Sequence, residues 1–369
     1  MTNTITIEHS DLTTACAMLA RVVEKKTYTP ILANVLFDGR GNMIATDLDI
    51  EFTYRLDGEF NHEPFTVELA QLSKIIKGAN KGGLVQMSYD KDSGTVAILS
   101  DGLESCEDSL PAADFPEWNK RDGKAQFFDV SESALHDALS FVAPCVSDEQ
   151  TRYYLRGVNL TQYRDSLTMV ATNGHQLAKL ETGLPITSDE DSPMGEGRGV
   201  IVPDKAVKVT LATIGAKGGD SLIAMTVQEK CITLGARKWS MRCKPVDGTF
   251  PDWTRVMPKE TGAWVELDRA DLLKATTRLA GVCDSPALQL KAWDSATLSS
   301  DGGKRTMPLK VKRSGDAVEI AFNHKYLAST CKAFNSELLH VSTSEQGSPA
   351  AFTSDGNRAR VRVVMPMRY

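Results

Sequence analysis

The stretch "LTTACAMLA" (residues 12–20) decides the fold, because its pattern occurs three times along the chain. It returns as "LHDALSFVA" (135–143) and as "LLKATTRLA" (272–280). Each copy has leucine first, alanine three residues later, leucine or valine after seven and alanine after eight. This spacing marks one face of an amphipathic helix. A pattern that recurs over such distances indicates a chain built from repeats.

A second amphipathic helix is predicted downstream of each copy. It lies in "VELAQLSKIIKG" (67–78), "VPDKAVKVTLAT" (202–213) and "FNHKYLASTCKAF" (322–334). Residue types that favour helix starts precede or open several of these helices. We expect helix starts at Ser10, Ser131, Pro203, Asp268 and Asn323.

A third marker is the trio of segments "ATDLDIEF", "ATNGHQLAKL" and "SSDGGKRTMPLKV", which centre on Thr46, Thr172 and Ser300. Segments that alternate between apolar and polar residues, such as "TVAILS" (95–100), predict half-buried antiparallel strands. Each repeat of roughly 120 residues therefore holds two helices and several strands, which is an α+β domain of ordinary size. The expected domains are residues 1–125, 126–260 and 261–369.

The composition of the 369-residue chain is that of a globular protein, with 41% hydrophobic and 24% charged residues. No run reaches the roughly 20 apolar residues that a membrane helix needs, and the first residues do not resemble a signal peptide. Seven scattered cysteines without CxxC spacing indicate neither a zinc site nor a disulfide framework. We therefore expect a reduced, cytoplasmic protein. The net charge of −6 argues against a protein that coats nucleic acid by bulk attraction.

An enzyme would need a constellation of catalytic residues, and the sequence offers few. His175 stands beside Asn173 and Thr172, but no GxSxG, HExxH or phosphate-loop motif accompanies it. The alternating carboxylates of "DLDIE" (47–51) resemble a metal site, yet we expect them on a solvated strand face. The six histidines do not have the spacing of metal ligands, so they do not indicate a metal site. The sequence predicts a non-enzyme without metal or cofactor.

Several motifs resemble those of the bacterial DNA polymerase III beta subunits, the sliding clamps. The resemblance implies three similar domains that form half of a ring, and a second chain that closes the ring head to tail. Twelve helices would line the hole, double-stranded DNA would pass through it, and a polymerase would be tethered for processive replication. The motifs are "TPILANVLF" (29–37), "ATDLDIEF" (45–52), "SLPAADFP" (109–116), "TRYYLRG" (151–157), "ATNGH" (171–175), "FPDWTRV" (250–256) and "MPMR" (365–368).

A ring holds DNA by topology, so it needs only a mildly cationic lining, since many phosphate contacts would hinder sliding. The second predicted helix of every repeat carries lysines and almost no acids, although the chain is acidic overall. Solvated helix faces are the plain alternative for these lysines, and a core strand is the alternative for the tyrosine pair that the resemblance places at the DNA exit. The expected DNA-binding residues are Lys26, Lys74, Lys77, Gln150, Arg152, Tyr153, Tyr154, Lys205, Lys208 and Lys332.

The resemblance also implies a pocket that receives a short clamp-binding peptide with a Gln and two apolar residues. Its partners would be the polymerase III alpha subunit, the clamp loader delta subunit, other polymerases and repair proteins. Flexible methionines in "VVMPMR" (363–368) suit a surface that accepts different peptides. Ordinary core packing is the alternative for any one of these residues. The expected pocket residues are Leu155, Thr172, Gly174, His175, Leu177, Pro251, Arg255, Val256, Tyr326, Pro349, Val363, Met365, Pro366, Met367 and Arg368.

The matching dimer interface is more polar than the family pattern, with Ser105 and Glu107 on one side and Val282 and Cys283 on the other. We expect a homodimer whose interface weakens with salt. The alternative is a non-sliding or accessory peptide-binding scaffold of the same fold, which would stay monomeric at low and high salt.

Overall fold

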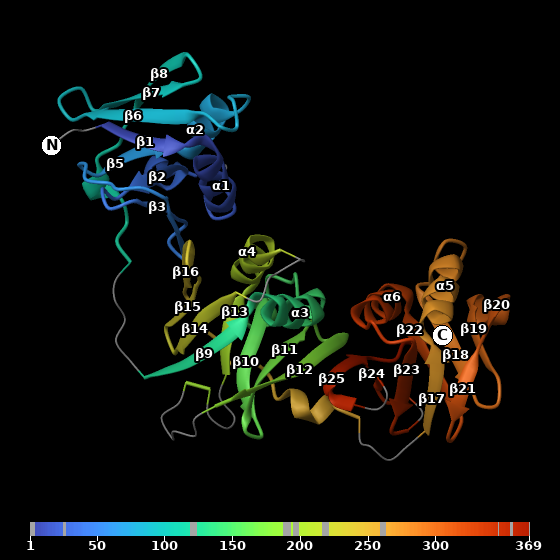
Figure 1. Cartoon of the computed structure of the whole chain (residues 1–369). Helices are drawn as coiled ribbons and strands as arrows, with labels where there is room; N and C mark the ends of the chain where they lie inside the picture. Colours follow the sequence, from blue (N-terminus) through green and yellow to red (C-terminus); the bar gives the residue numbers. More distant parts are fainter. Residues whose placement is uncertain are drawn as a thin grey trace. The chain divides into compact units, whose positions relative to one another are not determined.

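The computed structural model describes residues 4–24, 27–118, 124–186, 193–194, 199–215, 221–258, 263–345, 347–354 and 357–368. These residues form a mixed α+β structure, in which six α-helices accompany four antiparallel sheets (Figure 1). The contacts divide the chain into two compact units. The first unit comprises residues 1–133 and 208–245, and the second comprises 134–207 and 246–369.

The first unit holds a four-stranded and an eight-stranded sheet, with orders β1-β6-β7-β8 and β5-β2-β3-β4-β16-β15-β14-β9. Alternating burial along β1 and β7 leaves one face of the four-stranded sheet on the core, as predicted from the sequence. The strands are β1 (Thr4–Glu8), β2 (Asn34–Phe37), β3 (Asn42–Thr46), β4 (Ile50–Arg55), β5 (Phe65–Glu68), β6 (Leu84–Asp90), β7 (Thr95–Ser100), β8 (Leu103–Asp108), β9 (Ala125–Ser131), β14 (Leu222–Gln228), β15 (Cys231–Gly235) and β16 (Trp239–Cys243).

The second unit holds a nine-stranded sheet, β13-β10-β11-β12-β25-β24-β23-β17-β21, and a four-stranded sheet, β20-β19-β18-β22. The longer sheet carries most of the residues considered below. Its strands are β10 (Gly157–Tyr163), β11 (Ser166–Thr172), β12 (Gln176–Pro185), β13 (Gly199–Pro203), β17 (Ala263–Asp268), β21 (Val311–Ser314), β23 (Leu338–Thr343), β24 (Ala350–Ser354) and β25 (Asn357–Val364). The shorter sheet is formed by β18 (Ala287–Ala292), β19 (Ala296–Ser300), β20 (Arg305–Leu309) and β22 (Val318–Asn323).

The repeated helices form where the sequence predicts them. The first helix of each repeat buries the residues at the first, fourth and eighth positions of the repeated pattern, for example Leu12, Ala15 and Leu19. The last alanine of the pattern is not buried: Ala20 is exposed. The helices are α1 (His9–Leu19), α2 (Leu69–Ile76), α3 (Glu132–Val142), α4 (Asp204–Ile214), α5 (Arg269–Ala280) and α6 (His324–Ala333).

Two of the predicted helix starts are confirmed as caps by hydrogen bonds. The Asp268 side chain accepts from the Asp271 N–H at 2.9 Å, and the Asn323 side chain accepts from the Lys325 N–H at 2.9 Å. Ser10 is wrong as a cap, because α1 already begins at His9. Pro203 ends β13 immediately before α4, so it precedes the first turn that the sequence assigned to it. Ser131 directly precedes α3.

The third marker is a structural repeat as well. Thr46, Thr172 and Ser300 are the last residues of β3, β11 and β19. Two residues later each chain segment has a positive φ: 76° at Leu48, 86° at Gly174 and 68° at Gly302. All three turns reverse the chain, and Gly is the residue that adopts a positive φ without strain.

Apart from β21, which pairs with β17 at one edge, the sheets are built from sets of four neighbouring strands, which we call quartets. They are β1-β6-β7-β8, β5-β2-β3-β4, β9-β14-β15-β16, β13-β10-β11-β12, β17-β23-β24-β25 and β22-β18-β19-β20. Two joins link quartets across the expected domain boundaries: β4 pairs with β16, and β12 pairs with β25. The sheets are therefore continuous between repeats, and residues 119–123 and 259–262, next to the expected domain boundaries, lie outside the described residues.

The expectation of a solvated carboxylate face in "DLDIE" is wrong for Glu51. This residue is only 5% exposed, and its carboxylate forms an ion pair with Arg242 across the β4–β16 join. Asp49 pairs with Lys244 at 3.1 Å across the same join. The Asp47 carboxylate accepts from the Asp49 N–H at 3.0 Å and so stabilises the turn. These carboxylates hold two quartets together, and no group of His, Cys, Asp or Glu in the described residues could hold a metal ion.

All seven cysteines are free thiols. Among the helices of the described residues, none is long and apolar enough to cross a membrane.

Candidate functional site

A cavity of about 340 Å³ lies in the second unit, where four segments meet. They are the segment of the short helix η4 (Tyr153–Leu155), the turn between β11 and β12, a short helix η5 (Trp253–Val256), and the end of β25. The lining is mainly apolar with a few polar groups, as is usual for ligand pockets. The lining residues are Arg152, Tyr154, Leu155, Thr172, Gly174, Gln176, Leu177, Pro251, Asp252, Trp253, Val256, Val363 and Met365.

The β11–β12 turn is fixed by its own side chains. The Thr172 hydroxyl accepts from the Gly174 N–H at 3.1 Å and donates to the Gln176 carbonyl at 2.8 Å. The Asn173 side chain accepts from the N–H groups of His175 and Gln176, both at 3.0 Å. Short polar side chains that bond the backbone two residues on are typical of such turns. The motif "ATNGH" therefore builds one rigid wall of the cavity.

Gly174 is needed at this turn for two reasons. Its φ of 86° is unfavourable for residues with a Cβ. A Cβ at Gly174 would also lie 2.7 Å from Nη1 of Arg152, so the guanidinium occupies the space that a side chain would need. Arg152 is held there by an ion pair with Glu149, with Nε and Oε2 3.0 Å apart.

The second wall is η5, which Asp252 caps. Its carboxylate accepts from the Thr254 N–H at 3.1 Å and pairs with Nε of Arg255 at 3.0 Å. The hydrogen bond from the Thr254 side chain, joined by that from Arg255, lowers the pKa of Asp252. This cap turns Trp253 inward, onto the buried residues Leu177 and Val363, and leaves Val256 at the surface.

The segment after β25 forms the third wall. The Met365 N–H donates to the His175 carbonyl at 2.9 Å, and the Met367 N–H donates to the Ala321 carbonyl at 2.8 Å. The His175 ring stacks on Tyr326 of α6, with the ring centres 6.1 Å apart and the planes 13° from parallel. Two backbone hydrogen bonds thus hold the apolar "VVMPM" segment in place, and its methionine side chains remain half-buried.

The structure brings together eight of the predicted pocket residues: Leu155, Thr172, Gly174, Leu177, Pro251, Val256, Val363 and Met365. His175, Tyr326, Arg255, Pro366, Met367 and Arg368 adjoin these walls without lining the cavity, and Pro349 does not line it either. The sequence interpretation missed Gln176, Asp252 and Trp253, and it assigned Arg152 and Tyr154 only to DNA. All five lie within or next to the quoted motifs, so proximity along the chain was the available signal.

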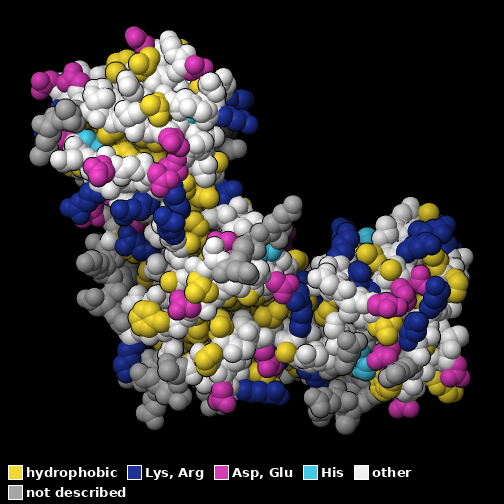
Figure 2. Space-filling model, viewed as in Figure 1, with side chains coloured by type: hydrophobic (Ala, Val, Ile, Leu, Met, Phe, Trp, Pro, Cys, Tyr) yellow, Lys and Arg dark blue, Asp and Glu magenta, His cyan; other side chains and the backbone are white. Residues whose placement is uncertain are grey.

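The predicted DNA-binding residues lie mostly on the surface. Lys26 lies outside the described residues, and Gln150 is exposed ahead of the short helix η4 (Tyr153–Leu155). The rings of Tyr153 and Tyr154 meet edge to face, 5.7 Å apart, with Tyr153 exposed. The face shown in Figure 2 carries basic and acidic side chains interspersed. The lysines lie on or directly after the second helix of each repeat, at Lys74, Lys77, Lys205, Lys208 and Lys332.

The predicted interface residues lie in two places. Ser105 and Glu107 are half-buried in β8, where the Ser105 hydroxyl donates to the Glu107 carboxylate. Val282 follows α5 and is 55% exposed, with Cys283 half-buried beside it. β8 and β20 each lie at the outer edge of a four-stranded sheet (Figure 1).

Repeated helix–sheet modules and a peptide-sized pocket define a modular binding protein. Three family models match the chain: the N-terminal domain of the DNA polymerase III beta subunit over residues 3–119, the central domain over 129–252 and the C-terminal domain over 254–368. The chain belongs to the DNA polymerase III beta subunit family. It is a DNA sliding clamp of the replication machinery and a non-catalytic processivity factor.

Named relatives extend over the whole chain. The beta sliding clamp of Pseudomonas putida is 28% identical, covering 98% of this chain and 99% of the relative. That of Caulobacter vibrioides is 27% identical, covering 99% of both. The crystal structure of a sliding clamp from Bartonella birtlesii, bound to griselimycin, is similar with a TM-score of 0.87 at 28% identity, and covers 100% of both chains. The crystal structure of the beta subunit from Pseudomonas aeruginosa is similar with a TM-score of 0.89 at 25% identity, and the match covers 99% of this chain and 100% of that chain.

Proposed function

We propose that two copies of this chain close head to tail into a ring around double-stranded DNA. The ring tethers the replicative polymerase by a peptide that enters the pocket described above. This proposal places the protein in the cytoplasm, where bacterial chromosomes are replicated, and keeps the expected domains at residues 1–125, 126–260 and 261–369.

The arrangement of the quartets carries the ring proposal. In the order in which the quartets are written above, the final strand of each is β8, β4, β16, β12, β25 or β20. Four of these strands are joined in pairs, β4 with β16 and β12 with β25, and all pairs are antiparallel. Of these six strands, β8 and β20 have no second neighbour among the described strands, while β1, β5, β9, β13, β21 and β22 are the other edge strands. An edge strand offers unpaired N–H and C=O groups to another chain, so a β8–β20 join between two copies repeats the internal joins and leaves neither edge open.

Charge supports the same pairing. β8 carries Glu104, Glu107 and Asp108, whereas Lys304, Arg305 and Lys310 lie in or beside β20. The internal β4–β16 join is likewise crossed by ion pairs, Glu51 with Arg242 and Asp49 with Lys244. A polar interface of this kind gives orientation and specificity, and it weakens as salt screens the charges. In this reading Ser105 and Glu107 face a second copy, with Val282 and Cys283 at the opposite edge.

The pocket supports the polymerase tether. Its apolar walls around Leu177, Val256 and Met365 and its few polar groups suit a short peptide with two apolar side chains and one amide. The polymerase III alpha subunit, the clamp loader delta subunit, and other polymerases and repair proteins are the proposed donors of such peptides. The exposed lysines of α2, α4 and α6, with Gln150, Tyr153 and Lys26, are the proposed DNA contacts.

The experiment that tests encirclement uses circular DNA. The protein is loaded onto a nicked circle by its clamp loader, and the circle is then cut once with a restriction enzyme. A ring slides off the new ends, so the bound protein disappears within minutes, while an uncut circle retains it. Retention on the linear DNA would instead support the non-sliding scaffold, because contact alone would then hold the protein.

A further inference from the structure

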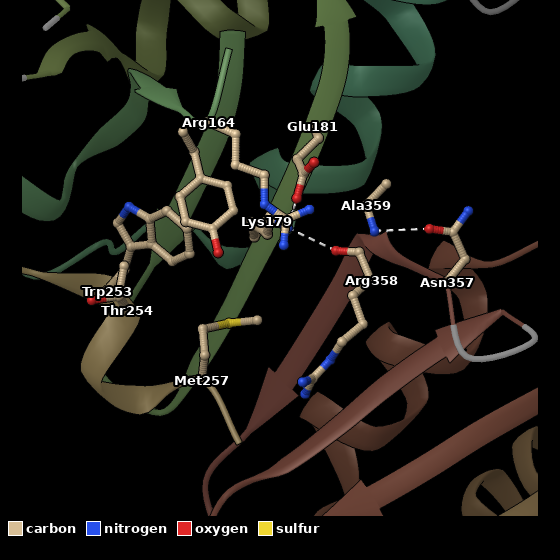
Figure 3. Close-up of a pocket in the computed structure, with 10 residues that line it drawn as sticks. Arg164, Lys179, Glu181, Trp253, Thr254, Met257, Asn357, Arg358 and Ala359 are labelled. Atoms are coloured by element: carbon tan, nitrogen blue, oxygen red, sulfur yellow. Dashed lines mark hydrogen bonds and ion pairs between the residues drawn. The ribbon is translucent and has the colours of Figure 1, made fainter. Parts of the chain in front are cut away.

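A second cavity, of about 370 Å³, lies in the second unit beside the peptide pocket (Figure 3). Its walls come from the β10–β11 turn, β12, η5 and the first residues of β25. Three cationic side chains line it, Arg164, Lys179 and Arg358. Among the described residues that line it, the one carboxylate is Glu181. The lining therefore has an excess of positive charge.

Two of the cations lie close together beside one aromatic ring. Figure 3 shows Arg164, Lys179 and Glu181 converging at one side of the cavity. Lys179 is only 3% exposed; it forms an ion pair with Glu181 and donates to the Arg358 carbonyl at 2.7 Å. Its Nζ lies 5.0 Å from the centre of the Tyr163 ring, and Cζ of Arg164 lies 5.3 Å from the same ring. The ring thus stabilises two cations in a small space.

Lys179 is a buried cation, and burial is the main influence on its pKa. Burial lowers the pKa of Lys179, Glu181 acts in the opposite direction, and the charges of Arg164 and Arg358 lower the pKa further. The sum is a lowered pKa, so the protonated amine is disfavoured relative to water. A bound anion would reverse this effect, because it adds a favourable charge to each of the three cations.

The cavity adjoins the peptide pocket through shared residues. Trp253 lines both cavities. Leu177 of the peptide pocket and Lys179 of the second cavity are two residues apart on β12, so they lie on the same face of the strand, about 7 Å apart. An extended chain advances about 3.3 Å per residue. A segment that leaves the peptide pocket across Trp253 therefore reaches the cations within a few residues.

We propose that this cavity is an anion subsite, which binds the carboxylate of an acidic residue in the same partner segment whose apolar residues occupy the peptide pocket. The inference rests on the peptide-binding function proposed above. It adds a specificity element: partners with an acidic residue a few positions from the apolar pair bind more tightly than partners without one.

The test uses fluorescent peptides that share a core with one Gln and two apolar residues. The core is extended at either end by three Gly/Ser residues and then by Glu-Glu or by Gln-Gln. Binding to the full-length protein is measured by anisotropy at low and high salt. We expect Glu-Glu at one end to tighten binding about fivefold over Gln-Gln, with the gain reduced by salt.

Arg164→Asn should abolish this gain. Asn is chosen because Arg164 has a φ of 54°, a conformation that Asn adopts comparatively readily. The matched control is Arg237→Asn, which removes the same charge from an exposed residue on the turn between β15 and β16. The control should keep the full gain, and both variants should bind the Gln-Gln peptides as the unaltered protein does.

The outcomes separate the two proposals. Failure of every peptide to bind would overturn the peptide pocket itself. Equal affinity for Glu-Glu and Gln-Gln peptides, with the core still binding, would overturn only the subsite. Inorganic phosphate is the third probe: saturable quenching of tryptophan fluorescence by phosphate, without any gain from Glu-Glu, would assign the cavity to free anions and overturn the partner-borne carboxylate.

Discussion

The backbone N–H of Met365 donates to the carbonyl oxygen of His175 at 2.9 Å, which ties the segment after β25 to the β11–β12 turn. One bond thereby connects two walls of the peptide pocket that are far apart in the sequence. A similar bond from Met367 to Ala321 anchors the segment two residues later.

Removal of residues 365–369 should weaken peptide binding at least tenfold and lower the free energy of unfolding by about 2 kcal/mol, because two backbone hydrogen bonds are lost. The point variants refine this expectation. Met365→Ala should weaken binding more than Met367→Ala, since Met365 lines the cavity and Met367 does not. Peptide titration with a thermal melt measures both effects. If the truncated protein bound the polymerase with unchanged affinity, the peptide-binding site would have to lie elsewhere on the protein.

Gly174→Ala should destabilise the protein by about 1 kcal/mol through its positive φ and should also displace the guanidinium of Arg152 from the pocket. Gly183→Ala is the matched control, because Gly183 has a φ of 74° but a Cβ there would meet no other part of the protein within 4 Å. Both variants should lose similar stability, and only Gly174→Ala should change peptide affinity. Equal peptide affinities for the two variants would show that Arg152 does not shape the site.

Charge reversal at the proposed dimer edge should change the oligomeric state. Glu104→Lys in β8 or Lys304→Glu before β20 should each weaken the dimer roughly fivefold to tenfold, because an attraction becomes a repulsion. The two variants mixed together, or the double variant, should recover much of the loss. Sedimentation at low and high salt is the measurement. A dimer indifferent to both reversals would place the interface elsewhere.

Asp11 should make the first unit less stable in acid. Burial opposes the charged form, but hydrogen bonds from the Asp57 N–H, the Tyr54 hydroxyl and Lys238 outweigh it, so the pKa of Asp11 is lowered. A lowered pKa stabilises the fold above the ordinary aspartate value of about 3.9, and this stability is lost as the pH falls through the folded-state pKa.

Asp11→Asn should therefore cost about 2 kcal/mol at neutral pH, and the difference from the unaltered protein should shrink below about pH 4. Denaturant unfolding at pH 7 and at pH 3 measures it. Asp92→Asn, at an exposed turn residue, serves as the control. A difference that stays constant between the two pH values would contradict the assignment.

The sequence predicted those features that depend on neighbours along the chain. Helical spacing placed Leu12, Leu135 and Leu272 in the core, because a helix repeats its faces within a few residues. The family motif "ATNGH" located Gly174, and the structure shows that this glycine has a positive φ in the turn. The cap at Ser10 failed because α1 starts one residue earlier, and helix ends are the least constrained part of a periodic pattern.

The pocket could be predicted only in part. Eight of its lining residues were expected on the strength of family motifs, whereas Trp253 and Asp252 were missed. Nothing local distinguishes a tryptophan that walls a cavity from one that fills a core. The cap by Asp252 settles this, since it turns Trp253 onto Leu177 and Val363.

By itself, the sequence determined the repeat and its helices, because helical periodicity acts over a few residues. Tertiary structure alone decided that Glu51 is buried against Arg242, 191 residues away, and that Lys179 is buried beside Arg164 and Arg358. Strand pairing causes both: β4 lies against β16 and β12 against β25, and the register of those joins selects which charges meet. Such a register is set by packing across the whole sheet, so no short stretch of the chain specifies it.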